Sequence, residues 1–140
     1  MKKYIIINGP NLNLLGKREP EVYGNKSFED FLITLRAKNP QISIEYYQSN
    51  IEGEIVNKIQ EIGFDYNGLI INAGAYTHTS IAIRDAISAI TTPSIEVHIS
   101  NIDAREEFRR TSFIGPVCIG SISGFGLHSY SLAISAFLKQ

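Results

Sequence analysis

The sequence predicts an α/β fold in which one parallel sheet of five strands is covered by helices on both faces. Short runs of apolar and β-branched residues alternate with amphipathic stretches along all 140 residues, and this alternation is typical of repeated strand–helix units. Several of the runs are apolar without a break, as expected for strands buried on both faces. The length is that of one domain, so we expect residues 1–140 to form a single unit.

The predicted strands cover residues 4–8, 42–48, 68–72, 94–98 and 117–121. Because only five strands fit into the chain, a doubly wound sheet with the flavodoxin-like order is favoured over the six-stranded dinucleotide-binding arrangement. The longest irregular stretch, residues 9–26, follows the first strand. A loop of this length in so compact a domain is usually functional.

Capping patterns and apolar spacing predict five helices between and after these strands. Ser27 followed by Asp30 is a capping box for a helix that ends near Lys38. Asp103 with Glu106 is a second capping box, for a short helix. The other three helices are indicated by apolar residues at helical spacing, with stops at Gly63 and Pro93 for the first two: Ile51, Ile55, Ile59 and Ile62; Ile83, Ile87 and Ile90; Leu127, Tyr130, Ile134 and Phe137.

Charge and hydropathy argue against several classes of partner. The 13 basic side chains almost cancel the 14 acidic ones, leaving a net charge of −1, so no global field would attract nucleic acid or a membrane surface. No apolar run approaches the roughly 18–20 residues of a membrane span. The apolar stretch near the N-terminus is too short for a signal peptide. We therefore expect a soluble cytoplasmic protein without a nucleic-acid or membrane partner.

The cysteine and histidine pattern argues against a metal site. Cys118 is the only cysteine, which excludes an intrachain disulfide and a multi-cysteine metal site. It lies in an apolar run, where a buried, unreactive thiol is expected. His78, His98 and His128 lack the spacing of metal ligands. The glycines of residues 120–126 follow the last strand, but their pattern favours a tight turn over phosphate binding.

Polar residues gather where the predicted strands end, and ligands bind beyond the carboxyl ends of strands in parallel α/β sheets. Asn8 and Asn11 follow the first strand, and Asn72 and His78 lie at and after the third. Glu96 and His98 alternate with aliphatic residues at the end of the fourth strand, so they share one face. A charged pair on a buried strand is costly unless it is used. This convergence predicts an active site at that edge of the sheet.

Structural roles remain open for several of these residues. The turn Asn8-Gly9-Pro10-Asn11 could serve the backbone alone, and His78 could satisfy backbone groups at a helix start. Arg105 and Arg109, four residues apart, could form one solvated helical face. Tyr23 could be a packed loop aromatic.

Six blocks of the sequence, in order and at matching intervals, resemble the type II 3-dehydroquinate dehydratase family over essentially the full length. They are residues 8–12 with 15–20, 22–24, 48–54, 71–80, 95–101 and 105–109. The resemblance implies a flavodoxin-like fold, a dodecamer built as a tetramer of trimers, and a mobile lid at about residues 16–25. It also implies that 3-dehydroquinate loses water by anti elimination through an enolate, in the shikimate pathway, without a Schiff base or cofactor. Asp103, where a neutral or aromatic residue is expected, departs from the family outside the catalytic positions.

The resemblance further implies the roles of individual residues. Tyr23 would be the base, and His98 the acid that protonates the departing hydroxyl. Arg18 and Asn11 would act with them. The chemistry of the residues themselves adds two supporting roles: Glu96 beside His98 could favour its protonated form, and Arg105 could approach the base from across the cleft. Substrate-binding positions would be Asn72, His78, Ile99, Ser100 and Arg109, together with Asp85, which would reach a neighbouring subunit's site.

Two other functional classes use the same fold. A signalling receiver needs an acidic cluster after the first strand, where this chain has Asn8, Gly9, Pro10 and Asn11. A flavin or nucleotide module wants a glycine- and hydroxyl-rich phosphate loop at that turn, and bound yellow chromophore would reveal it. A purely structural or scaffold protein would not need the combination of Arg18, Tyr23 and His98.

Overall fold

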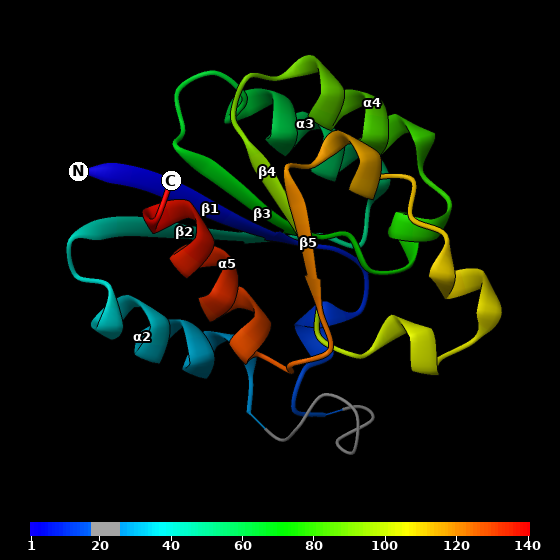
Figure 1. Ribbon diagram of the computed structural model, residues 1–140, viewed down its shortest axis with the longest axis horizontal. Coiled ribbons are helices and arrows are strands. Elements are labelled where there is room, and N and C mark those ends of the chain that lie inside the picture. Colours follow the sequence, from blue (N-terminus) through cyan, green and yellow to red (C-terminus); the bar gives the residue numbers. More distant parts are fainter. Residues whose placement is uncertain (18–25) are drawn as a thin grey trace.

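The computed structural model describes residues 1–17 and 26–140 and has the predicted α/β fold (Figure 1). Five strands pair in parallel in the order β2-β1-β3-β4-β5, which is the flavodoxin-like order. Their bounds are β1 Lys2–Asn8, β2 Ile42–Gln48, β3 Gly68–Asn72, β4 Ser94–His98 and β5 Gly120–Ser123.

Within residues 1–17 and 26–140, four α-helices cover the two faces of the sheet (Figure 1). Helices α2 (Phe28–Lys38) and α5 (His128–Leu138) lie on one face. Helices α3 (Glu52–Glu61) and α4 (Ile81–Ala89) lie side by side on the other. In the part of the chain that the structure describes, short 3-10 helices follow strand ends and turns, at η1 Leu12–Leu14, η2 Gly74–His78, η3 Ile102–Ala104, η4 Glu107–Arg110 and η5 Gly115–Val117. Within the described ranges, no helix is long and apolar enough to span a membrane.

The strands supply two hydrophobic cores because successive side chains point to opposite faces of a sheet. Along β1, Ile6 packs in the core beneath α2 and α5, whereas Ile5 and Ile7 pack beneath α3 and α4. The central strand β3 is buried at every position. Burial on both faces is the reason for its unbroken apolar run.

The helix ends confirm part of the capping prediction. The Ser27 hydroxyl accepts a hydrogen bond from the Asp30 amide at 3.1 Å, and this bond starts α2. Ile51 is 57% exposed and precedes α3, so its place in the apolar stripe was wrong. Gly63 follows α3, and glycine is required there because a Cβ would lie only 2.3 Å from Cγ2 of Ile90.

Two predicted elements differ in the structure. The fifth strand begins at Gly120, not at residue 117, because the segment with Pro116 turns as η5 first. The predicted helix after Asp103 is divided into η3 and η4. Its cap comes from Asn101, whose Oδ1 accepts from the Asp103 amide at 3.2 Å, while the Glu106 carboxylate is paired with arginine instead.

Cys118 is partly exposed and not buried as expected. Its burial is still sufficient to raise the pKa of the thiol to about 12, with the charge of Glu96 adding to the effect. The thiol therefore stays protonated and unreactive at neutral pH.

Candidate active site

A pocket lies at the carboxyl ends of β1, β3 and β4, as the clustering of polar residues predicted. It is lined by eight of the predicted site residues: Asn11, Asn72, His78, His98, Ile99, Ser100, Arg105 and Arg109. Parallel pairing explains the convergence, because it brings the ends of neighbouring strands to one edge. Asn8 of β1 is the register partner of Asn72 of β3.

Three other predicted site residues lie elsewhere or outside the described residues. Asp85 is exposed on α4 and does not line the pocket of its own chain. Arg18 and Tyr23, and with them most of the predicted lid at residues 16–25, lie outside the described residues. The twelfth residue, Glu96, lies directly behind His98.

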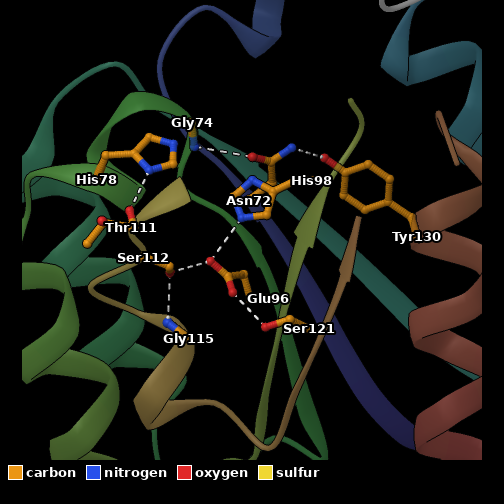
Figure 2. Close-up of polar contacts among 10 residues, drawn as sticks. All are labelled: Asn72, Gly74, His78, Glu96, His98, Thr111, Ser112, Gly115, Ser121 and Tyr130. Carbon is orange, nitrogen blue, oxygen red and sulfur yellow. Dashed lines mark hydrogen bonds and ion pairs between the residues drawn. The ribbon is translucent and has the colours of Figure 1, made fainter. Parts of the chain in front are cut away.

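Glu96 and His98 form a buried pair on one face of β4, as their period-two spacing predicted. His98 Nε2 lies 2.9 Å from Glu96 Oε2, and both side chains are almost fully enclosed. Figure 2 shows the His98 ring with one nitrogen turned toward the carboxylate. An ionised carboxylate can only accept hydrogen bonds, so Nε2 carries the hydrogen and Nδ1 is the ring nitrogen left for chemistry.

Two serines complete the surroundings of the Glu96 carboxylate. Ser112 donates to Oε2 at 2.6 Å and Ser121 donates to Oε1 at 2.6 Å. The Gly115 amide donates to the Ser112 oxygen at 2.9 Å, which leaves the Ser112 hydrogen for Glu96. Burial alone would raise the pKa of Glu96, but the bonds from His98, Ser112 and Ser121 outweigh it and lower the pKa to about 2.

His78 stands beside His98 in the pocket. The two rings are 6.3 Å apart between centroids and nearly parallel. His78 Nδ1 is 2.7 Å from the Thr111 carbonyl oxygen, and since a carbonyl only accepts, Nδ1 must carry hydrogen. Burial lowers the pKa of His78, the bond to Thr111 opposes this, and His98 and Arg109 add to the lowering. A neutral His78 then offers Nε2 to the pocket as an acceptor.

The two asparagines of the site are held in different ways. Asn72 uses Oδ1 to accept from the Gly74 amide at 3.2 Å and Nδ2 to donate to the Tyr130 hydroxyl at 3.0 Å. Asn11 has a left-handed backbone with φ of 70°, which asparagine tolerates better than most residues. Its amide donates to Asn50 Oδ1 at 3.0 Å, a bond that holds the turn and involves only the backbone of Asn11.

The turn between β1 and η1 also has a steric requirement. A Cβ at position 9 would lie 2.4 Å from the carbonyl oxygen of Ala73. Gly9 therefore lets the turn after β1 approach the turn after β3, which is the backbone role considered for this turn. The turn also serves the site, because the same close approach brings Asn11 to the pocket.

Positive charge enters the pocket from the segment after β4. Arg109 Nε lies 2.9 Å and Arg105 Nε 3.8 Å from Glu106 Oε1. The two arginines are therefore joined through one exposed carboxylate. They do not share a helical face, because Arg105 lies between η3 and η4 whereas Arg109 lies in η4. A hydrogen bond from its own backbone amide, followed by that from Arg109, lowers the pKa of Glu106. An anionic ligand is the natural occupant beside two guanidinium groups.

Sequence reasoning missed the residues that support the site from behind. Ser121 could have been found from strand order, because it is the register partner of Glu96. Ser112 and Thr111 lie in an irregular segment without a periodic signal. Tyr130 was correctly predicted in the apolar stripe of the last helix, but that pattern carries no information on its hydroxyl. In the described ranges, no group of three or more His, Cys, Asp or Glu residues could hold a metal ion.

Comparison with known proteins gives one consistent family. The family model described as dehydroquinase class II matches residues 2–138. A 3-dehydroquinate dehydratase of Exiguobacterium sp. is 54% identical over 139 residues, which are 99% of this chain and 95% of that protein.

Two crystal structures agree with this. The type II dehydroquinase of Butyrivibrio crossotus superposes with a TM-score of 0.90 at 49% identity, covering 98% of this chain and 97% of that one. The type II dehydroquinase of Propionibacterium acnes gives 0.94 at 38% identity, with 100% and 98% covered.

Proposed function

The chain belongs to the class II dehydroquinase family, and we propose that it is the enzyme that dehydrates 3-dehydroquinate to 3-dehydroshikimate in the shikimate pathway. One observation of the site carries the chemistry: a buried histidine at the pocket wall is held by an ionised carboxylate behind it. This is the arrangement expected of a general acid whose orientation must be fixed.

His98 is the acid in this proposal. The reaction removes a proton next to the ketone and expels a hydroxyl group, which departs as water once it is protonated. The imidazolium gives its Nδ1 proton to that oxygen while Nε2 stays bonded to Glu96. Glu96 contributes by stabilising the positive charge on the ring before transfer and by holding the ring in place.

Tyr23 is the base, and Arg18 its partner in the same segment. A tyrosine has a pKa near 10 in peptides, and lowering it by about two to three units needs roughly 3–4 kcal/mol of preferential phenolate stabilisation. An arginine within a few ångströms can supply this in a water-poor site. The phenolate takes the proton next to the ketone, and the electron pair left behind forms an enolate. Collapse of the enolate expels the hydroxyl on the opposite face, which makes the elimination anti.

The remaining polar groups bind the substrate. Asn11, Asn72 and His78 present amide and imidazole groups that suit the substrate hydroxyls, and the backbone amides of Ile99 and Ser100 would take its carboxylate. The pocket lining supports this set. Arg109, with Arg105 beside it, adds the positive charge that an anionic substrate requires.

The enolate is not covalently attached to the enzyme. A Schiff base would need a lysine in the pocket, and none of the chain's seven lysines lines it: Lys2, Lys3, Lys17, Lys26, Lys38, Lys58 and Lys139. Each is within the described residues. The distribution of lysines therefore supports general acid–base chemistry over covalent catalysis.

We also propose that the enzyme works as a homo-oligomer, a dodecamer made of four trimers. Asp85 supports an assembled site, because it is exposed on α4 and lies outside the pocket of its own chain. In this proposal it reaches the site of a neighbouring subunit.

A spectrophotometric assay tests the function directly. Purified protein should convert 3-dehydroquinate into 3-dehydroshikimate, detected by the absorbance of the new conjugated double bond. We expect the activity to persist in EDTA and to need no added cofactor. Folded protein without activity on this substrate between pH 6 and 9 would refute the proposal.

A further inference from the structure

A buried tyrosine of the last helix reaches the binding residue Asn72. Tyr130 lies in α5 and is fully enclosed, with 0% exposure. Its hydroxyl accepts from Asn72 Nδ2 at 3.0 Å and donates to Asn8 Oδ1 at 2.7 Å. Figure 2 shows the ring entering from α5 with its hydroxyl turned toward Asn72. The C-terminal helix is thus linked to the ends of β1 and β3.

Donor and acceptor can be assigned in each of the hydrogen bonds that join Gly74, Asn72, Tyr130 and Asn8. The Gly74 amide can only donate, so the oxygen of the Asn72 side chain must face it. The nitrogen of that side chain therefore faces Tyr130 and donates to the hydroxyl oxygen. The hydroxyl hydrogen then goes to Asn8, whose Oδ1 accepts it. Burial raises the pKa of Tyr130, so the hydroxyl stays protonated and remains a donor.

Loss of the Tyr130 hydroxyl would leave the Asn72 side chain held at one end only. Asn8 and Asn72 are register partners on adjacent strands, and the two residues are buried, with 0% and 4% of their surface exposed. Without the hydroxyl, Asn72 would keep only its bond to Gly74 on one side of the amide plane. A side chain held at one end can rotate, and a binding group that rotates loses affinity for its ligand.

We propose that Tyr130 is a positioning residue that holds the Asn72 amide in the orientation in which its remaining N–H and oxygen lone pair meet the substrate. This rests on the proposed function of Asn72 as a substrate-binding residue. Tyr130 itself is enclosed in the core and touches the substrate only through Asn72. Its ring also packs against Phe28 and Phe31, with centroids 4.9 and 6.0 Å away. A phenylalanine would serve that packing equally well, so the hydroxyl separates positioning from packing.

The test is Tyr130→Phe, compared with Tyr4→Phe as the matched control. Tyr4 is buried in the same core at 3% exposure and is not part of the chain of hydrogen bonds to Asn72. We expect Tyr130→Phe to raise KM for 3-dehydroquinate about tenfold, as for one lost hydrogen bond of the binding group. The value of kcat should stay within about twofold and the pH profile should not move. Tyr4→Phe should leave KM unchanged.

Asn8→Ala is the second variant, because it removes the far acceptor and leaves the phenol in place. It should raise KM in the same direction, and it keeps the test open if Tyr130→Phe does not fold. A crystal structure of each variant gives a readout that needs no activity: the Asn72 amide should leave its wild-type orientation in Tyr130→Phe and keep it in Tyr4→Phe.

The outcomes separate the two proposals. An inactive wild-type protein would refute the proposed function, and the crystal structures would still decide whether the hydroxyl orients Asn72. An active wild type with an unchanged KM and an unmoved Asn72 in folded Tyr130→Phe would refute the positioning role alone. Equal effects of Tyr4→Phe and Tyr130→Phe on KM would refute it too, since packing would then explain both.

Discussion

His98 and Glu96 are two residues apart on β4, and Nε2 of the first lies 2.9 Å from Oε2 of the second. The contact settles which ring nitrogen is available, because the one facing the carboxylate is committed to it. A proton given to the substrate must come from Nδ1. The pair also explains why a strand with two ionisable side chains can be buried at every position.

His98→Ala should therefore lower kcat steeply, by about 10²–10⁴-fold, which is the typical contribution of a general acid or base. KM should change much less, because the proton is transferred in the transition state. Steady-state kinetics on protein shown to be folded by circular dichroism would measure both. A loss below threefold would assign the acid role to another group.

Glu96 should make the stability of the protein depend on pH. Its pKa is about 2 in the fold and about 4.3 in an unfolded chain. The lowered pKa contributes stability that is fully present above about pH 4.5 and is lost as the pH falls toward 2. From the size of the shift this is about 3 kcal/mol at most.

Glu96→Gln removes this contribution. Urea unfolding of the two proteins at one fixed protein concentration should show a difference in the free energy of unfolding that shrinks as the pH falls from about 4.5 toward 2. A difference in unfolding free energy that stays the same from about pH 4.5 to 2 would mean that folding does not lower the pKa of Glu96.

Ser121→Ala should weaken the hold on Glu96 without touching the pocket. It removes a donor at 2.6 Å, so the pKa of Glu96 should rise and the acid side of the stability profile should move to higher pH. We expect kcat to fall about threefold to tenfold, since His98 is then held less firmly.

Ser94→Ala is the matched control for this change. Ser94 is also a buried serine of this part of the sheet, but its hydroxyl faces the Thr92 carbonyl at 3.4 Å. It should leave both the acid profile and kcat unchanged. Equal shifts in the two variants would show that any lost serine hydroxyl has this effect.

The parts of the fold with regular periodicity could be predicted from the sequence, and the supporting contacts could not. Strand order followed from length and alternation, and strand order alone placed Asn72, His98 and their neighbours at one edge. The cap of η3, by contrast, could not be predicted. Asn101 and Asp103 both have side-chain oxygens that can cap a helix, and the sequence pattern does not show which of them accepts the bond. The bond of Tyr130 to Asn8 joins residues 122 positions apart, and only the packed fold brings them together.

Asp85→Ala should raise KM for 3-dehydroquinate without lowering stability, because an exposed side chain that serves a neighbouring site contributes little to its own fold. Asp65→Ala removes one exposed carboxylate outside the pocket and is the control for loss of charge. Light scattering should give a mass well above the 15.6 kDa of one chain. A monomeric mass, or kinetics unchanged by Asp85→Ala, would contradict the shared site.

The identity of the base can be tested by combining substitution with chemical trapping. Tyr23→Phe removes only the hydroxyl that would take the first proton, so turnover should cease while the affinity for substrate stays close to that of the wild type. Tyr47→Phe, which changes a tyrosine on β2 outside the pocket, should leave the rate unchanged. Arg18→Ala should act in the same direction as Tyr23→Phe. Any activity it retains should show its basic limb moved to higher pH, because the phenolate loses its neighbouring positive charge.

Borohydride added with the substrate should leave the activity intact, since an enolate that is not attached to a lysine gives no imine to reduce. Mass spectrometry of the treated protein would detect an adduct on any of the seven lysines. A trapped adduct, or a Tyr23→Phe variant that turns over at a near-normal rate, would refute the acid–base mechanism even if 3-dehydroquinate is the substrate. The two tests are independent. Borohydride trapping shows whether the intermediate is covalently attached, and the Tyr23→Phe rate shows which group removes the proton.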